Sequence, residues 1–192
     1  MRRTDHEGHA QSSGSNLSKR QEAGVAEVVN GRYTARMDES FVVFIIGMRI
    51  NKLFAVRKWV PTARAMGPML RELYQHPEKG FLGGEFFVYW RGPMLVQYWR
   101  SFEDLERFAR NPDDPHMPAW QRFNRTVGKD GSVGIFHETY IVERGSYEAI
   151  YGNMPVFGLA KATEHVRAVG GRETARRRLM RGENEPAVPS PE

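Results

Sequence analysis

The sequence predicts an α+β fold, a single sheet covered by helices, and two observations carry this prediction. First, stretches typical of strands and helices follow one another as strand, helix, strand, strand, helix, strand. This β-α-β-β-α-β order is that of a ferredoxin-like sheet. Second, residues 41–48, FVVFIIGM, are apolar at nearly every position. A strand without polar alternation must have both of its faces covered.

The 192 residues suit one domain with tails. Residues 1–32 are rich in Ser, Gly and Gln, and we expect a disordered N-terminal tail in which residues 30–32 open a polar lead-in that continues to residue 40. The predicted domain covers residues 33–145. Residues 146–171 return over it and end in a short amphipathic helix that includes His165. The Arg-rich residues 172–192 are expected to be disordered.

After the first strand, residues 51–76 are predicted to be mostly helical, with a kink or break at Gly67 and Pro68. Two aromatic strands, residues 81–90 and 94–100, then form a hairpin. Gly83 and Gly84 in its first strand suggest a bulge or a place where another segment approaches the backbone.

The second half of the domain starts at Ser101, a good N-cap, and Asp104 places an acid near the positive end of helix 101–110. The sequence NPDDP ends this helix, and another helical piece, residues 116–128, follows. These two pieces together form the second helical connection of the predicted fold.

The last strand, residues 132–143, reads SVGIFHETYIVE and carries polar groups on both faces. Alternation places His137 on one face and Glu138 and Tyr140 on the other. A strand that only packs has no need of a histidine beside a carboxylate, because each must find a partner when buried. We expect His137 to line a pocket; the alternative is that both are satisfied structural groups.

Composition excludes several classes of function. The chain has no cysteine, so it has no disulfides, thiolate metal sites or cysteine nucleophile, and it suits a reducing cytosol. No apolar run reaches the roughly 20 residues of a membrane span.

The formal net charge is +5, but many basic residues crowd into the two ends, which favours solvated tails over a nucleic-acid site. Dinucleotide, phosphate-loop, zinc-protease and serine-elbow motifs are absent. We expect a cytoplasmic protein without nucleic-acid or membrane partners.

The apolar first strand also bears on assembly. In a domain of this size the chain's own helices cover one face of the sheet, while the other face needs a second layer. A second subunit is the economical supplier of that layer, and the sequence therefore predicts a homodimer.

Several stretches resemble a family of bacterial and fungal monooxygenase-like proteins that includes the fumagillin-pathway monooxygenase type. They are VVFIIGMRINKLFAVRKWVP, GFLGGE, LVQYWRS, GIFHETY, YEAIYGNMPVFGL and the pair His116 and Trp120. The resemblance covers residues 33–162. It implies a dimeric α+β barrel, the fold of antibiotic-biosynthesis monooxygenases, haem-degrading monooxygenases, chlorite dismutases and aldoxime dehydratases. It further implies a small monooxygenase-like enzyme acting on a hydrophobic substrate of secondary metabolism.

Haem is the cofactor that the resemblance implies, since haem-binding members often place an axial histidine on or near the second helix. His116 and Trp120 lie four residues apart and would share one helix face. Haem needs a fixed imidazole, an apolar slot and cations for its propionates. His116 is the expected iron ligand, Trp120 and Arg122 are expected cofactor contacts, and Arg49 or Arg100 are further candidate cations.

Three alternatives stay open. Cofactor-free oxygenation needs a base and anion-stabilising donors in a dry cavity, with His137 as the base and Arg49, Asn51 and Tyr140 as donors. A haem-dependent dehydratase of the aldoxime type would use His116 as ligand and His137 for proton transfer. A non-enzymatic dimeric binding protein would keep the histidines as core residues and fill the pocket with Phe and Met.

Overall fold

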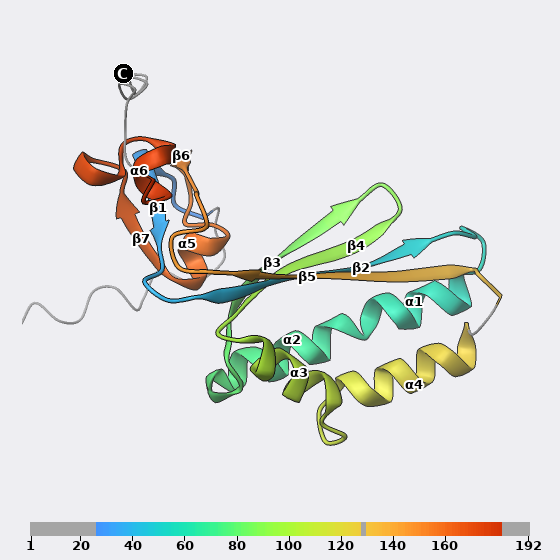
Figure 1. Cartoon of the computed structure of the whole chain (residues 1–192). Coiled ribbons are helices and arrows are strands. Elements are labelled where there is room, and N and C mark those ends of the chain that lie inside the picture. Colours follow the sequence, from blue (N-terminus) through green and yellow to red (C-terminus); the bar gives the residue numbers. More distant parts are fainter. Residues whose placement is uncertain (1–25, 128–129, 182–192) are drawn as a thin grey trace, which may run out of the picture.

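A four-stranded antiparallel sheet with helices on one face forms the body of the molecule (Figure 1). The computed structural model describes residues 26–127 and 130–181. The strands lie in the order β3-β4-β2-β5, and their bounds are β2 (Phe41–Ile50), β3 (Phe81–Tyr89), β4 (Gly92–Trp99) and β5 (Val133–Val142). The helices are α1 (Val56–Arg64), α2 (Met66–Gln75), α3 (Phe102–Arg110) and α4 (His116–Thr126), with a short 3₁₀ helix η1 (Pro77–Lys79) before β3. This topology confirms the predicted ferredoxin-like α+β fold.

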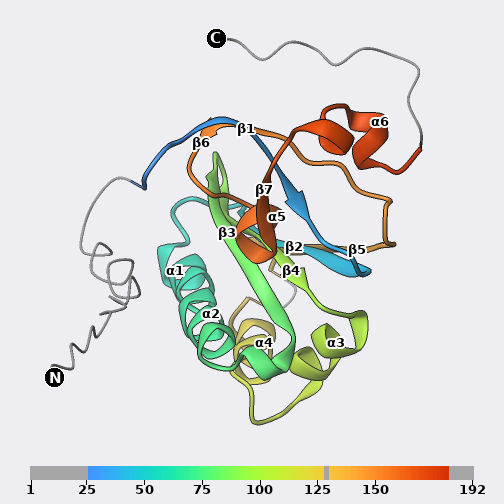
Figure 2. The same ribbon diagram turned by 90° about the vertical axis from the view of Figure 1, so that its left-hand side faces the viewer.

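A second, three-stranded sheet lies at one end of the first (Figures 1 and 2). Its order is β6-β1-β7, and its elements are β1 (Val29–Arg36), β6 (Tyr151–Met154), α5 (Leu159–Ala162), β7 (Glu164–Arg167), η2 (Gly170–Arg172) and α6 (Ala175–Arg178). The described residues differ here from expectation. The lead-in is strand β1, His165 lies in strand β7 rather than in a helix, and the stretch 172–181, which was expected to be disordered, contains helix α6. The strands that pair with β1 lie more than 100 residues later in the chain, so no local sequence pattern predicts this pairing. The expected disorder of residues 1–25 and 182–192 falls outside the described residues.

β2 is one of the two inner strands of this sheet, between β4 and β5. It pairs along its whole length with β5 and along most of it with β4. On the helix side of the sheet, one core cluster joins three strands (β2, β3 and β4) to two helices (α2 and α3): Val42, Leu73, Phe81, Trp99, Leu105 and Phe108. Burial of these apolar side chains fixes α2 and α3 against the sheet.

The opposite face of the sheet is covered at one end by the C-terminal part of the same chain. Phe41 packs there with Ala35, Leu159 and Ala160, and Val43, Tyr98 and Tyr147 surround this cluster. The rest of that face, nearer the hairpin of β3 and β4, carries no helix (Figure 1). The chain therefore supplies only part of the second layer that β2 requires.

Three local predictions are confirmed. The pairing register of β3 shifts between Phe81 and Gly83, and a Cβ at Gly83 would lie 3.3 Å from the Cα of Ala162, so α5 is the segment that approaches this backbone. The long helical stretch breaks in two at Ala65, next to the predicted Gly-Pro. The Ser101 hydroxyl accepts a hydrogen bond from the Asp104 backbone N–H at 3.1 Å and caps α3.

Asp104 is buried at the start of α3 and holds two arginines. Its carboxylate accepts hydrogen bonds from Arg100 Nε at 2.8 Å and from Arg107 Nη1 at 2.7 Å. Burial opposes the charged form, but these guanidiniums outweigh it and keep the pKa of Asp104 below its usual value. The ionised carboxylate therefore stabilises the folded state.

Replacing Asp104 with Asn should lower the free energy of unfolding by about 2 kcal/mol at neutral pH, because the charge-assisted bonds are lost. A carboxyl with a lowered folded-state pKa stabilises fully above its unfolded pKa and loses this contribution as the pH falls through the folded pKa. Urea unfolding of both proteins should give a constant difference above about pH 5 that shrinks below about pH 4. A difference that does not change with pH would contradict the ionic role.

Candidate functional site

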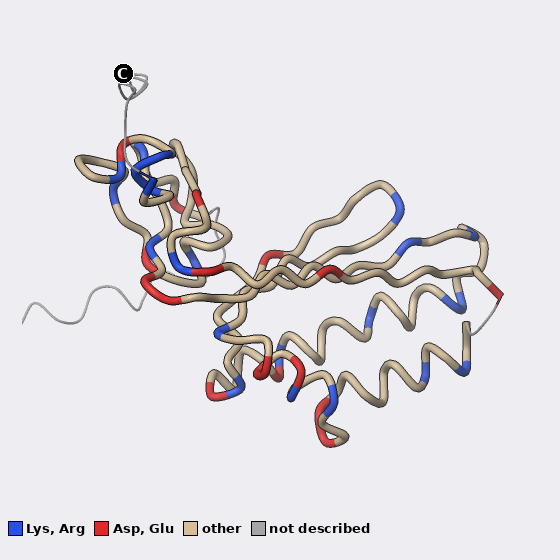
Figure 3. Tube along the Cα trace, viewed as in Figure 1, with Lys and Arg blue, Asp and Glu red and all other residues tan. Residues whose placement is uncertain are grey.

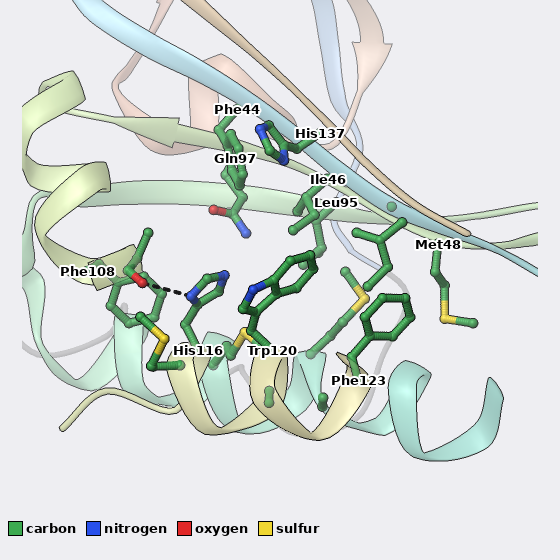
Figure 4. A pocket seen from close by; sticks show the side chains of 18 of the residues that line it. Phe44, Ile46, Met48, Leu95, Gln97, Phe108, His116, Trp120, Phe123 and His137 are labelled. Carbon is green, nitrogen blue, oxygen red and sulfur yellow. Dashed lines mark hydrogen bonds between the residues drawn. The ribbon is translucent and has the colours of Figure 1, made fainter. Parts of the chain in front are cut away.

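A cavity of about 470 Å³ lies between the helices and the sheet (Figure 4). This volume falls in the range of ligand pockets. Alternate residues of the strands form its sheet wall: Phe44, Ile46, Met48, Leu95, Gln97, Ile135, His137 and Thr139. Side chains of α1 to α4 form the other wall, among them Thr62, Met66, Met69, Phe108, His116, Met117, Trp120 and Phe123. The lining is mostly apolar, with few polar groups at defined positions.

His116 opens helix α4 and stands in the cavity wall (Figure 4). Its Nδ1 lies 2.9 Å from the carbonyl oxygen of Ala109 in α3. A carbonyl oxygen can only accept, so Nδ1 carries the hydrogen and donates it. In the neutral imidazole, the lone pair of Nε2 is then available to a metal, a cofactor or a proton. The Phe108 ring, 6.4 Å away between centroids, packs against the imidazole and limits its movement.

Trp120 and Arg122 accompany His116 on α4, and both line the cavity. The indole of Trp120 stacks on Phe123 with centroids 5.7 Å apart and planes at 18°. Two cations border the cavity, Arg122 and Lys58. Lys58 forms an ion pair with Asp130, whereas Arg122 forms no ion pair with any other described residue. Arg122 is therefore the cation available to an acidic group of a ligand.

The sheet wall contributes the other polar groups. His137 in β5 packs at a tilt against Phe44, with ring centroids 5.7 Å apart. Gln97 in β4 is buried, and its Oε1 accepts a hydrogen bond from Trp99 Nε1 at 2.9 Å. Histidines thus line the cavity from both walls, His116 from the helices and His137 from the sheet (Figure 4).

Arg49, Asn51 and Tyr140 are not brought to this cavity. Arg49 Nη1 donates to Asn51 Oδ1 at 2.5 Å, and Asn51 Nδ2 donates to the Gly131 carbonyl at 3.1 Å, so both are engaged at the exposed end of β2. Tyr140 donates to Glu138 at 2.5 Å on the other face of the sheet, and this bond raises the pKa of Tyr140. The physical reason is strand alternation, which turns Arg49 away from Met48 and Tyr140 away from His137.

Of the arginines expected to pair with haem propionates, only one lines the cavity. Arg100 is bound to Asp104 and does not line the cavity, which leaves Arg122 of the three candidates. Gln97, by contrast, was not predicted as a site residue. One sequence feature could have identified it. Leu95, Gln97 and Trp99 are alternate residues of one strand, and Gln97 is the single polar residue on this otherwise apolar face.

Residues 41–159 match the family described as monooxygenase af470-like. The chain belongs to this family. Monooxygenase af470 of Aspergillus fumigatus is 28% identical over 151 residues, which cover 67% of this chain and 53% of the relative. The chain thus spans about half the length of this curated relative. The matched residues contain the whole four-stranded sheet, its helices and every lining residue of the cavity.

Two solved aldoxime dehydratases share the fold. One, in complex with butyraldoxime, has 15% sequence identity and a TM-score of 0.56, and the similarity covers 69% of this chain and 42% of that one. The other has 19% identity and a TM-score of 0.54, covering 71% of this chain and 44% of that one. Each of these chains is more than twice as long as the part that this chain matches.

Charge and hydropathy of the described residues bear on the expected partners. Figure 3 shows basic residues along α1 and α4, neither of which contains an acidic residue, and around α6. Among residues 26–127 and 130–181, no helix has the length and apolar character needed to cross a bilayer. The absence of nucleic-acid and membrane partners and the cytoplasmic location stay predictions.

Proposed function

We propose that this chain is a small oxygenase that binds haem in the cavity through His116 and acts on a hydrophobic substrate. The observation that carries the proposal is the hydrogen bond from His116 Nδ1 to the Ala109 carbonyl. It fixes the ring and leaves Nε2 as the donor atom, the arrangement that iron-ligating histidines use. A substrate of secondary metabolism is the class that the resemblance to the fumagillin-pathway type implies.

The other lining residues fit the group. Phe44, Ile46 and Trp120 give the apolar surface that a macrocycle requires, and Arg122 supplies a cation for a propionate. In the described part of the chain, no cluster of three or more His, Asp or Glu side chains could hold a metal ion alone. Haem would need only one imidazole from this cavity, because the nitrogens of the macrocycle supply most of the iron's ligands.

Haem, when bound, supplies the redox chemistry with oxygen that protein side chains lack. The chain's own groups have the remaining tasks. His116 holds the cofactor, with its orientation set by Ala109, and the apolar walls exclude water from the reacting atoms. His137, on the sheet wall, is the titratable side chain placed to accept or return a proton of the substrate.

The first test is a titration of the purified protein with haemin, followed by visible absorption before and after reduction. We expect a sharp Soret band that saturates at one haem per chain, and oxygen uptake that depends on haem, reductant and a hydrophobic substrate. No haem uptake would overturn the cofactor assignment. It would favour cofactor-free oxygenation with His137 as base, and His137 would be the residue to mutate next.

A haem-dependent dehydratase is the second candidate, and the observation that favours it is the pair of histidines on opposite walls. One would hold haem and the other, His137, would transfer the proton while an aldoxime loses water to give a nitrile. Butyraldoxime under anaerobic conditions distinguishes the two reactions, since dehydration consumes no oxygen. The binding-protein alternative predicts a filled pocket, and a cavity of about 470 Å³ argues against it.

We also propose a homodimer in which a second copy covers the open part of the outer sheet face. Alternation places Ile45, Val96, Phe87, Phe136 and Tyr140 on this face, and 37% of the surface of Phe136 is exposed. The matched regions make up only 42% and 44% of the aldoxime dehydratase chains, which leaves room in each for a second unit of similar size. Two copies of this chain would together match the length of one such chain, with one copy in the place of each unit.

Phe136→Glu should convert the dimer to a monomer, because a carboxylate would be buried against an apolar face. Light scattering after gel filtration measures the mass directly. Ile141→Glu is the matched control, since it lies on the same strand, is more exposed and points to the helix side. A wild-type protein that is monomeric at micromolar concentration would refute the proposed dimer.

A further inference from the structure

Gln97 holds an amide group at the cavity in one defined orientation. It lies in β4 between Leu95 and Trp99, and only 7% of its surface is exposed. Trp99 is wholly buried, and its indole N–H donates to Gln97 Oε1 at 2.9 Å. An indole N–H can donate but cannot accept, so the oxygen of the amide must face Trp99. The amide NH₂ group therefore faces the other way.

The NH₂ group of Gln97 has no hydrogen-bond acceptor among the described residues, although Gln97 lines the cavity. Figure 4 shows its nitrogen directed into the space that His116 and Trp120 face from the helices. This nitrogen is not among the fully buried unpartnered polar atoms of the described residues, which are Arg91 Nε and Ser132 Oγ, so it is accessible from the cavity. Water can accept its hydrogen bond while the cavity is hydrated, and a ligand that displaces this water must offer an acceptor in its place or lose the bond. A ligand with an acceptor at this position is therefore preferred over one without it.

We infer that Gln97 positions the substrate by donating a hydrogen bond to its carbonyl oxygen. The donor is a neutral amide in an apolar wall, so the partner it selects is a neutral acceptor on a hydrophobic molecule. The substrate class is accordingly a largely apolar ketone or similar carbonyl compound. This inference rests on the proposed function only in requiring that the cavity binds a hydrophobic ligand.

The placement of Gln97 is compatible with the role of His116. The two side chains come from opposite walls, Gln97 from the sheet and His116 from α4 (Figure 4). A ligand held by Gln97 stays on the sheet side, where His137 also lies, and leaves the imidazole of His116 accessible. One wall would then hold the cofactor and the other would orient the substrate.

The test compares two probes of the same shape, 2-acetylnaphthalene and 2-isopropenylnaphthalene, by calorimetric titration of the purified full chain. Only the ketone accepts a hydrogen bond. We expect the wild type to bind the ketone about 3- to 10-fold more tightly than the alkene. Gln97→Met should abolish this preference and leave the alkene affinity within about twofold. Thr139→Val, another polar residue of the same wall, should retain the preference.

Gln97→Glu adds a readout that a merely structural role would not change. Its carbonyl oxygen can still accept from Trp99, while its second oxygen donates when protonated and not when ionised. The ketone preference should therefore be present at low pH and lost as the pH rises through the carboxyl pKa. If neither probe binds the wild type, the proposed binding of a hydrophobic substrate in this cavity fails, and this inference fails with it, whereas the haemin titration tests the cofactor separately. If both bind with a preference that Gln97→Met leaves unchanged, only the role of Gln97 is overturned.

Discussion

Haem affinity is expected to fall by about 100-fold or more in His116→Ala, because the substitution removes the only imidazole that α4 presents to the cavity. Nδ1 of His116 is held by the Ala109 carbonyl, so the ring would lose little conformational entropy when Nε2 binds the iron. No other histidine of the helix wall can replace it. Titration with haemin, followed at the Soret band in wild type and variant, gives both affinities.

His137→Ala is the matched control for this prediction. It removes a second imidazole from the same cavity but from the opposite wall, and it should keep the Soret band. Added imidazole should restore the band in His116→Ala, because the truncated side chain leaves space where the ring stood. A variant whose haem spectrum equals that of the wild type would show that His116 is not the ligand.

The main sheet and the His116 and Trp120 pair were predictable because their signals are local. Apolar runs, strand-like alternation and helical spacing act over a few residues, and β2 and α4 follow them. β1 was missed because it is polar in sequence and owes its existence to β6 and β7, whose pairing lies far along the chain. Tertiary pairing outweighs local propensity in such cases.

One feature of the candidate site follows from strand alternation in the sequence, and another depends on the folded structure. The alternation of β5 already separates Tyr140 from His137, so a pocket containing both is inconsistent with one flat strand, and the structure places them on opposite faces. Gln97 was missed for another reason. Its amide matters only because Trp99 fixes its orientation and a cavity lies beside it, and neither fact exists before the chain is folded.

Trp99→Ala is expected to lower the free energy of unfolding by about 3–5 kcal/mol, the cost of truncating a large buried aromatic side chain. Trp99 is wholly buried, with Phe81 at 5.5 Å and Phe108 at 5.7 Å between ring centroids. The cavity left behind would border on both β3 and α3, which Trp99 joins. Urea unfolding at neutral pH measures the loss.

Trp90→Ala is the control for Trp99→Ala, because it makes the same chemical change at the tip of the same hairpin, where 81% of the side chain is exposed. Its cost should stay within about 0.5 kcal/mol. The buried variant should also weaken haem binding at temperatures where it remains folded, since Trp99 supports Phe108, which packs on His116, and fixes Gln97. Equal unfolding free energies for the two variants would contradict the proposed contribution of Trp99 to stability. Unchanged haem binding in Trp99→Ala would show that the cavity does not depend on the support that Trp99 gives to Phe108 and Gln97.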